Sequence, residues 1–336
     1  MKSVLLKKIA LAAAVALLAS QASAQVLKIA TLSPDGSGWM NAMRAGAEEI
    51  KSRTQGRVEF KFYTGGAMGT DRAVLSKIKI GQLQGGAVTA GSLVEYAKDV
   101  QVYSTPLQFK SFDEVDYVRS RMDGKLTHML DDAGVVSFGF AEGGFAYAMS
   151  KNAPITSVAS LRQEKVWIPD NDRQSEEALH AFGVTPVPLA LADVLTSLHT
   201  GIVNAVASSP IATLALQWHT EVKYLTDMPI EYFVGTLAVD KKVFEHLSPA
   251  DQAVVREVMT RQFKQIDQQN RKDNVAAFNA LLKQGIKPVK PSAQEQQEWA
   301  HYGELASQRI LSMNIVSPQI LGEMDGDLKA YRAGQK

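Results

Sequence analysis

The chain has 336 residues and a nearly balanced charge, with 36 lysine and arginine residues against 35 aspartate and glutamate residues. Such a balance gives no reason to expect nucleic acid or an anionic membrane surface as a partner. The sequence contains no cysteine, which excludes disulfides, cysteine nucleophiles and thiolate metal sites. A chain of this length is long enough for two domains, each with its own hydrophobic core.

The first 24 residues have the pattern of a secretory signal peptide. Three lysines among the first eight residues precede an apolar run at 9–19, and the small residues Ala22-Ser23-Ala24 follow. This order predicts cleavage after Ala24 and export to a bacterial periplasm. Loss of the three lysines would change the net charge from +1 to −2. A retained membrane anchor is the less favoured alternative, because the apolar run is too short to span a bilayer comfortably.

A first series of alternating strands and helices follows Gln25. Short apolar or alternating runs predict strands, and apolar residues repeated every three or four positions predict helices. The expected strands are residues 26–30, 58–62, 87–90 and 135–140, and the expected helices begin near Trp39, Thr70 and Ser111. This order favours an open, mainly parallel sheet with helices on both faces.

A second series begins near Phe145. A strand at 145–149 leads into a polar crossing at 150–154, and helices separate further strands expected at residues 165–169, 185–189, 203–207 and 233–240. Two series predict two lobes. We expect lobe I to contain residues 25–146 and 236–285, lobe II to contain residues 147–235, and residues 286–336 to form a C-terminal helical segment and tail.

A long helix is expected between the second series and the C-terminus. Ser248-Pro249-Ala250-Asp251 is a strong helix start, with serine as the N-cap and proline at the first helical position. No glycine or proline intervenes before Gly285, so the helix should exceed roughly thirty residues, which is long for a globular protein, and it could bridge both lobes. A last helix is expected around residues 295–313, and the polar end at 329–336 is expected to be loose.

Motifs of catalysis and cofactor binding are not found. The sequence has no P-loop, no His-Glu-x-x-His motif and no Gly-x-Ser-x-Gly motif. Its six histidines lack the spacing of a metal site. We therefore expect a binding protein for a small molecule, without a cofactor or a metal, rather than an enzyme.

Three tryptophans lie near the carboxyl ends of expected strands, where open α/β sheets bind their ligands. Trp39 begins the first helix, Trp167 lies in the strand at 165–169, and Trp218 follows the helix after the strand at 203–207. Each of these side chains could line a cleft or pack in a core.

Several blocks of the sequence form a specific combination. Residues 183–189 read Gly-Val-Thr-Pro-Val-Pro-Leu. The block Leu161–Pro169 precedes this segment, and the block Asp193–Asn204 follows it. Earlier in the chain, Tyr63–Gly69 is a glycine-rich turn. Together they resemble the DctP-type solute-binding proteins of TRAP (tripartite ATP-independent periplasmic) transporters, over nearly the whole mature chain. The resemblance implies a two-lobed α/β fold with two mainly parallel sheets and flanking helices. Hinge strands and a long lobe-spanning helix would join the lobes, which would close on a ligand. It also implies delivery of that ligand to the membrane subunits of a TRAP permease.

The sequence departs from the family pattern where relatives hold an organic acid. The clamping arginine of the family corresponds here to Trp167, a second arginine to Ala146, and an aspartate to Asn204. A guanidinium binds a carboxylate bidentately, and a buried carboxylate without a partner is costly. We therefore expect an apolar, aromatic or cationic ligand rather than a simple dicarboxylate. Arg162 and Arg173 lie nearby in the sequence and could replace the clamp, which keeps an acid open.

The predicted ligand site combines aromatic walls with neutral hydrogen-bonding groups. Trp167 would stack on the ligand, and the residues from Asp170 to Asp172 would meet a polar or cationic group at a helix start. The candidate ligand-binding residues are Trp39, Phe145, Trp167, Asp170, Asn171, Arg173, Asn204, Ser208, Ser209 and Trp218.

Other partners and functions stay open at this level. Some relatives with hydrophobic clefts work with an additional periplasmic TPR protein, so such a protein is a candidate partner here. The alternatives to transport are a sensor protein that presents its ligand to a receptor and, less favoured, a periplasmic hydrolase on the same scaffold. A hydrolase would need a nucleophile paired with a base, and the sequence does not show such a pair.

Overall fold

The computed structural model describes residues 24–170 and 172–335. The expected signal peptide, except its last residue, and Asn171 lie outside the described residues. The strands are β1 (Gln25–Thr31), β2 (Val58–Tyr63), β3 (Gly85–Thr89), β4 (Val135–Ser137), β5 (Ala141–Ser150), β6 (Trp167–Pro169), β7 (Val187–Leu189), β8 (Ala205–Ser208), β9 (Tyr224–Asp240) and β10 (Lys287–Val289).

Helices connect these strands and cover them. The α-helices are α2 (Gly38–Arg53), α3 (Asp71–Lys79), α4 (Phe112–Asp132), α5 (Val158–Leu161), α6 (Arg173–Ala181), α7 (Val194–Thr200), α8 (Pro210–Ala215), α9 (Lys241–Glu245), α10 (Pro249–Lys283), α11 (Ala293–Ser312) and α12 (Pro318–Gly334). Short 3₁₀ helices are η1 (Ala90–Leu93), η2 (Lys98–Ser104), η3 (Leu191–Asp193) and η4 (Trp218–Thr220). Within the described ranges, none of the helices combines the length and apolar character needed to cross a membrane.

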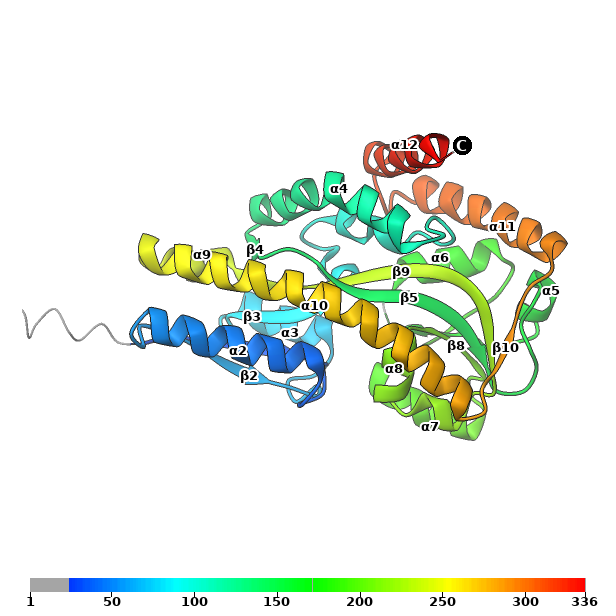
Figure 1. Cartoon of the computed structure of the whole chain (residues 1–336), viewed down its shortest axis with the longest axis horizontal. Coiled ribbons are helices and arrows are strands. Elements are labelled where there is room, and N and C mark those ends of the chain that lie inside the picture. The colour runs from blue at the N-terminus through cyan, green and yellow to red at the C-terminus, as the bar shows by residue number, and fades with distance from the viewer. Residues whose placement is uncertain (1–23, 171, 336) are drawn as a thin grey trace, which may run out of the picture.

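Eight strands form one mixed sheet that extends through the molecule (Figure 1). Its main order is β2-β1-β3-β9-β5-β8, and β4 and β10 pair with the two ends of β9. Strands β1, β2 and β3 are parallel, whereas β9 runs antiparallel to both β3 and β5. Strands β6 and β7 form a small parallel sheet that adjoins β8 through one bridge, between Val166 and Ala205.

Strands β5 and β9 cross from one lobe to the other. The last residues of β9 pair with β3 in lobe I, and its earlier residues pair with β5, which also pairs with β8 in lobe II. The two-lobed α/β architecture is thus confirmed, but the expectation of two separate, mainly parallel sheets is wrong. Sequence patterns locate strands without giving their direction, and only residues 233–240 of β9 are predicted as strand. The expected lobe boundaries at residues 146 and 235 fall inside these two crossing strands.

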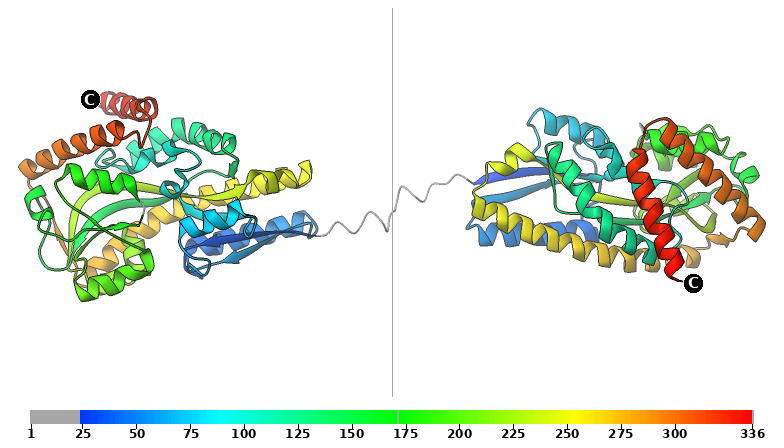
Figure 2. Two further views of the ribbon diagram at one scale, coloured as in Figure 1. Left: turned by 180° about the vertical axis from the view of Figure 1, so that it is seen from behind. Right: turned by 90° about the horizontal axis from the view of Figure 1, so that it is seen from above.

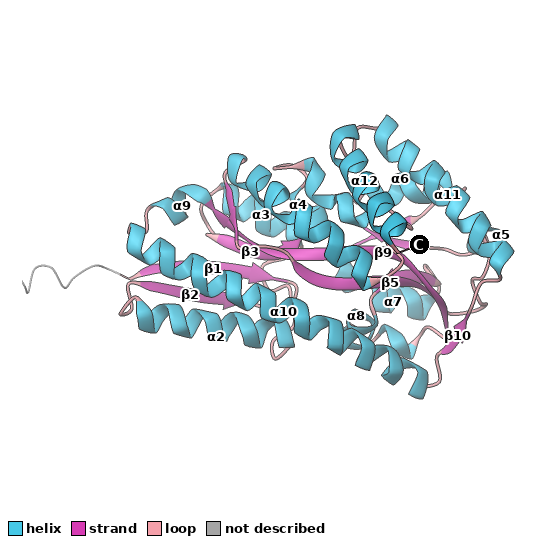
Figure 3. Ribbon diagram, turned by 45° about the horizontal axis from the view of Figure 1, so that its top comes forward, coloured by secondary structure: helices cyan, strands magenta, loops and turns pink. Residues whose placement is uncertain are grey.

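Helix α10 has 35 residues and links the cores of the two lobes. Ser248 caps it as predicted, since its hydroxyl oxygen accepts a hydrogen bond from the Asp251 N–H at 3.1 Å. The helix lies along α2 and continues past β5 to α8 (Figures 1 and 3). Phe263 near its middle packs in the core of lobe I, and Leu281 near its end packs in the core of lobe II. The prediction of a lobe-spanning helix is confirmed.

Glycine is required where β5 passes α10. Gly144 has φ +98°, and a Cβ at this position would lie 2.7 Å from the amide nitrogen of Asn274, so a side chain would be both strained and obstructed. Asn274 donates to the Gly143 carbonyl and accepts a hydrogen bond from the Ile211 N–H of α8, each at 3.3 Å. Helix α10 is therefore tied to the crossing strand and to lobe II at one point.

The C-terminal segment divides between the lobes. Helix α11 packs against α6, and α12 packs against α4 (Figure 2). The prediction of a loose tail at 329–336 is wrong for residues 329–334, because α12 continues to Gly334. The buried residues Met324 and Leu328 give α12 an apolar face, and the Arg332 guanidinium pairs with Glu114 at 2.7 Å. This packing stabilises a segment whose polar composition alone suggests disorder.

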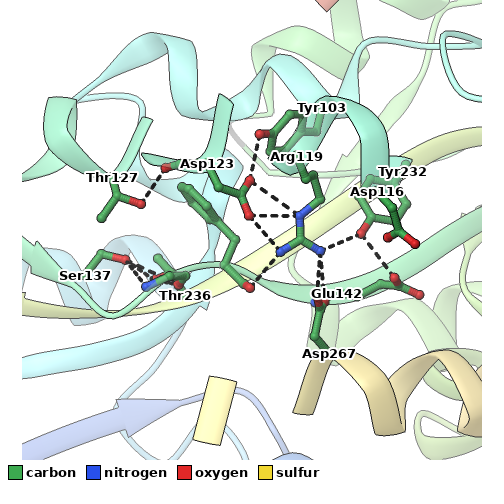
Figure 4. A network of polar contacts seen from close by, with 12 residues as sticks. Tyr103, Asp116, Arg119, Asp123, Thr127, Ser137, Glu142, Tyr232, Thr236 and Asp267 are labelled. Atoms are coloured by element: carbon green, nitrogen blue, oxygen red, sulfur yellow. Dashed lines mark hydrogen bonds and ion pairs between the residues drawn. The ribbon is translucent and has the colours of Figure 1, made fainter. Parts of the chain in front are cut away.

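A buried guanidinium joins α4, α10 and the crossing strands (Figure 4). Arg119 of α4 donates to Asp123, to Asp267 of α10 and to the Tyr232 hydroxyl of β9, at 3.0, 2.9 and 3.1 Å. Asp267 also accepts a hydrogen bond from the Glu142 N–H of β5 at 2.7 Å. Each nitrogen of the guanidinium is hydrogen-bonded, which compensates for the loss of hydration on burial.

Replacement of Arg119 by methionine should lower the free energy of unfolding by about 3–5 kcal/mol, because it leaves carboxylates partly buried without their cation. Arg121→Met on the same helix is a matched control, since Arg121 is largely exposed and stacks on Tyr117 at the surface, and it should cost less than about 1 kcal/mol. Urea unfolding followed by circular dichroism measures both losses. Similar small losses would show that the fold does not depend on Arg119.

Candidate functional site

A cavity of about 840 Å³ lies between the two lobes. The ends of β1 and β3 and the segments that follow them line it from lobe I, and β6, β8 and the helices after them line it from lobe II. Ile230 and Glu231 of the crossing strand β9 also line it. The cavity thus lies at the carboxyl ends of strands, where α/β sheets bind ligands.

Four helices begin at this cavity. Ser37, Thr70, Asp172 and Ser209 are the N-caps of α2, α3, α6 and α8, and each side chain accepts a hydrogen bond from a backbone N–H of the first helical turn. All four caps line the cavity. Because each strand-to-helix turn places its cap at the edge of the sheet, the cavity has polar side chains at its rim whose hydrogen bonds are already partly used.

All four tryptophans line the cavity. Trp167 and Trp218 pack edge to face with ring centroids 5.1 Å apart, and the Trp167 indole N–H donates to the Leu189 carbonyl at 3.0 Å. These two side chains are only 6% and 2% exposed, so each presents a small part of its ring to the cavity. Trp39 is half-buried, packs edge to face on Phe263, and has a buried indole N–H for which the described residues provide no acceptor.

The cavity extends into lobe II between the sheet and helices α6 and α11. Its walls there are aliphatic and aromatic, because they come from the apolar faces that pack these helices on the sheet. The residues of this apolar extension are Ala148, Ile155, Leu161, Val166, Ala178, Phe182, Ala205 and Trp299. A solute with an apolar body could fill this poorly hydrated space at little cost in free energy.

Of the predicted serine, asparagine and aspartate residues that the structure describes, three lie at the cavity and one does not. Ser208 and Ser209 line it, and Ser209 also caps α8. Asp170 lines it with an exposed side chain. Asn204 lies before β8, at the opposite end of the strand, and its side-chain oxygen accepts a hydrogen bond from the Lys165 N–H at 2.6 Å. Asn204 is not among the residues that line the cavity.

Phe145 and the candidate arginines are also placed away from the cavity. Phe145 packs against Phe112 and Tyr232 in the core. Arg173 is exposed at the start of α6, and Arg162 donates to the Phe182 carbonyl at 2.7 Å. None of these three side chains lines the cavity. Neither arginine therefore offers its guanidinium to the cavity in this structure, and Asn171 lies outside the described residues.

Glu231 is a cavity residue that sequence reasoning missed. Burial raises the pKa of its carboxyl to about 8, and the nearby negative charge of Asp172 adds to the shift, while a hydrogen bond from Ser104 opposes it. Its exposure is intermediate rather than nil, because the side chain borders the cavity. A lone acid between Ile230 and Tyr232 could have indicated a functional residue. The predicted strand begins only at residue 233, so the prediction does not place Glu231 on a strand.

Two further acids with raised pKa values line the cavity. Asp172 accepts hydrogen bonds from the Ser175 N–H and hydroxyl at 3.0 and 2.7 Å, and burial raises its pKa. Asp71, at the start of α3, accepts from the Thr89 N–H and from the Ser92 hydroxyl at 3.1 and 2.8 Å, and burial raises its pKa as well. Within the described residues, no group of three or more histidines, aspartates and glutamates could hold a metal ion.

Two α/β lobes joined by crossing strands, with a largely apolar cavity between them, define a solute-binding protein. The sequence of residues 29–311 matches the family model of the bacterial extracellular solute-binding proteins, family 7, called DctP. The chain belongs to this family, whose members are periplasmic solute-binding proteins of TRAP transporters and not enzymes.

Sequence relatives are distant. The C4-dicarboxylate-binding periplasmic protein DctP of Rhodobacter capsulatus is 26% identical over 210 residues, which cover 61% of either chain. A solute-binding protein of Verminephrobacter eiseniae is 22% identical over 61% of this chain and 62% of its own length. The chain thus matches less than two thirds of the length of these relatives.

Solved structures of the same fold match this chain over almost the whole length of both proteins. The sugar acid binding protein DctPAm of Advenella mimigardefordensis, in complex with galactonate, has a TM-score of 0.84 and 17% identity, over 91% of this chain and 98% of its own. DctP7 of Bordetella pertussis, a receptor binding pyroglutamic acid, has a TM-score of 0.81 and 18% identity, over 91% of this chain and 100% of its own. At such identities the similarity establishes the fold.

Replacement of Glu231 by glutamine should change the pH dependence of stability. The pKa of Glu231 is about 8 in the folded chain against an ordinary value of 4.5, so the folded state keeps a proton that the unfolded state releases, and the native chain loses stability as the pH rises between these values. Glutamine does not titrate. The variant should therefore gain at least about 1 kcal/mol over the native chain between pH 5 and pH 8.

Urea unfolding at the two pH values measures this gain. Glu176→Gln is the matched control, because Glu176 is an exposed residue of α6 and should give the same difference from the native chain at both pH values. An equally constant difference for Glu231→Gln would contradict the raised pKa.

Proposed function

We propose that this protein is exported with cleavage of its signal peptide near Ala24, captures a small organic solute in the interlobe cavity and delivers it to the membrane subunits of a TRAP permease. The family membership supports the role, and the position of the cavity between two lobes supports capture by enclosure. The chemistry of the cavity supports the choice of ligand class.

The observation that carries the ligand class is the apolar extension of the cavity with tryptophans in its walls. Relatives are named for C4-dicarboxylates or sugar acids, and such polar ligands need a hydrogen-bond partner for most of their atoms. We assign Trp167 to the position of the family's clamping arginine from the sequence pattern, and this side chain packs against Trp218. Arg162 and Arg173 do not line the cavity. These features favour a solute with an apolar or aromatic body over a simple dicarboxylate.

A neutral aromatic probe, N-phenyl-1-naphthylamine, should bind the mature chain at one site and quench tryptophan fluorescence, because all four tryptophans line the cavity. Ala207→Phe should weaken this binding by about tenfold or more, since Ala207 of β8 lines the cavity and a phenyl group would fill part of it. Fluorescence titration measures both affinities.

Ala276→Phe is the matched control for this experiment. Ala276 is exposed on α10 and does not line the cavity, so the affinity for the probe should not change. If the probe does not bind, or if both variants bind it as the native chain does, the cavity is not the apolar ligand site that we propose.

Delivery is tested separately in the source bacterium. Strains that lack either this chain or the partner permease should lose uptake of the same solute, identified from the mass spectrum of whatever co-purifies with the protein. A periplasmic TPR protein is a further proposed partner, and its loss should reduce the same uptake. Uptake that persists without this chain would contradict a role in transport.

A further inference from the structure

We propose that Glu231 is the residue that determines the polar part of the solute, and that together with Asp172 it binds a positively charged nitrogen group on an otherwise apolar molecule. This inference rests on the proposed function and adds to it the class of the ligand's head group. It places the specificity of the site on the crossing strand β9 rather than on the strand that carries Trp167.

The position of Glu231 supports this role. It lies in β9 opposite Ala146 of β5, next to an irregularity in the pairing of these strands. It lines the cavity, and so do Ser104 and Asp172, which are the polar groups that act on its carboxyl. Asp172 already uses its two oxygens to cap α6. Glu231 is therefore the acid of this pair with more unused hydrogen-bonding capacity.

The charge of the lining favours a cation. Among the described residues that line the cavity, six are carboxylic acids and two are basic. The acids are Asp71, Glu95, Glu142, Asp170, Asp172 and Glu231, and the bases are Arg72 and Lys79. Lys79 pairs with Glu95 at 2.5 Å, and the positive charge of Arg72 also lowers the pKa of Glu95. Both bases thus balance an acid in lobe I, whereas Glu231 has Asp172 as its charged neighbour.

A second acceptor in the same cavity is an independent sign of a missing donor. Glu142 of β5 lines the cavity with a side chain that is 0% exposed. Its Oε2 accepts a hydrogen bond from Arg271 at 2.8 Å, but its Oε1 is buried and has no donor among the described residues. A buried acceptor without a partner costs free energy, so a ligand donor that reached Glu142 would relieve this cost.

A carboxylate on the ligand would meet the opposite situation. It would add a negative charge beside Asp172 and would oppose ionisation of Glu231 in a region of low dielectric, where repulsion between like charges is large. An ammonium group would neutralise one of the two acids, and the half-buried Trp39 could add a cation–π contact. An acid could bind here only if Glu231 kept its proton and donated it.

The two modes of binding differ in the sign of proton exchange. Burial and Asp172 raise the pKa of Glu231 to about 8, so its carboxyl is mostly protonated at neutral pH. A cation stabilises the ionised form, so its binding releases the Glu231 proton to solvent and becomes tighter as the pH rises from 6 to 8. An anion stabilises the protonated form, so its binding takes up a proton and becomes weaker over the same range.

The experiment compares three probes of matched shape. Displacement of bound N-phenyl-1-naphthylamine by 2-phenylethylamine, 2-phenylethanol and 3-phenylpropionate is measured at pH 7.5. We expect the amine to bind at least about tenfold more tightly than the acid, with the alcohol between them. Calorimetry in two buffers of different ionisation enthalpy should show proton release on binding of the amine.

Variants assign the effect to Glu231. Glu231→Gln should lose the preference for the amine and the proton release, with about a tenfold loss of affinity for the amine and no comparable loss for the alcohol or for N-phenyl-1-naphthylamine. Retained binding of these neutral probes also shows that the variant is folded. Glu176→Gln, an exposed acid on α6 that does not line the cavity, should behave as the native chain does.

The outcomes separate this inference from the proposed function. If N-phenyl-1-naphthylamine binds but the acid competes as well as the amine, or if Glu231→Gln keeps the preference for the amine, the inference is overturned and the apolar ligand site stands. The same conclusion holds if the alcohol displaces the probe and the amine does not. If N-phenyl-1-naphthylamine does not bind the native chain, the proposed ligand class fails, and the inference fails with it.

Discussion

Arg119 lies where the two lobes meet, and its guanidinium holds together elements that come from distant parts of the chain. It donates to Asp267 of α10 and to Tyr232 of β9, while Asp267 accepts the N–H of Glu142 in β5. The crossing strands and the lobe-spanning helix are thus fixed to α4 by one buried cation. A buried guanidinium tolerates little displacement, because each lost hydrogen bond leaves a desolvated charge. The positions of α4 and α10 against the crossing strands are fixed by this network.

The same network reaches the cavity through Glu142. This residue accepts hydrogen bonds from Arg271 with one oxygen and borders the cavity, while Arg271 also pairs with Asp116 of α4 at 2.8 Å. The residues that join the lobes and the residues that would meet a ligand are therefore neighbours on β5 and β9. A solute that supplies a donor to Glu142 or Glu231 would alter the electrostatic balance at the crossing strands, which links binding to the arrangement of the lobes.

The cavity combines an apolar side with an excess of acids, whereas relatives are named for ligands that are themselves acids. Its lobe II side is apolar, Trp167 packs against Trp218 in its wall, and the acids in its walls outnumber the bases. An indole has neither the positive charge nor the bidentate donor of a guanidinium. One fold can carry sites of different chemistry, because function depends on the side chains of the site rather than on the arrangement of strands and helices.

Sequence by itself determined the class of fold, the family and the long helix, because these depend on local patterns. Apolar periodicity marks strands and helices, and Ser248-Pro249 with Gly285 delimits α10. Tertiary structure decided the direction of β9, the formation of helix α12 near the C-terminus and which residues line the cavity. Asn204 and Ser208 lie at opposite ends of one short strand, so only the latter borders the cavity. The sequence also could not single out Glu231, because its pKa is raised by burial in the folded chain and by the negative charge of Asp172, which is far away along the chain.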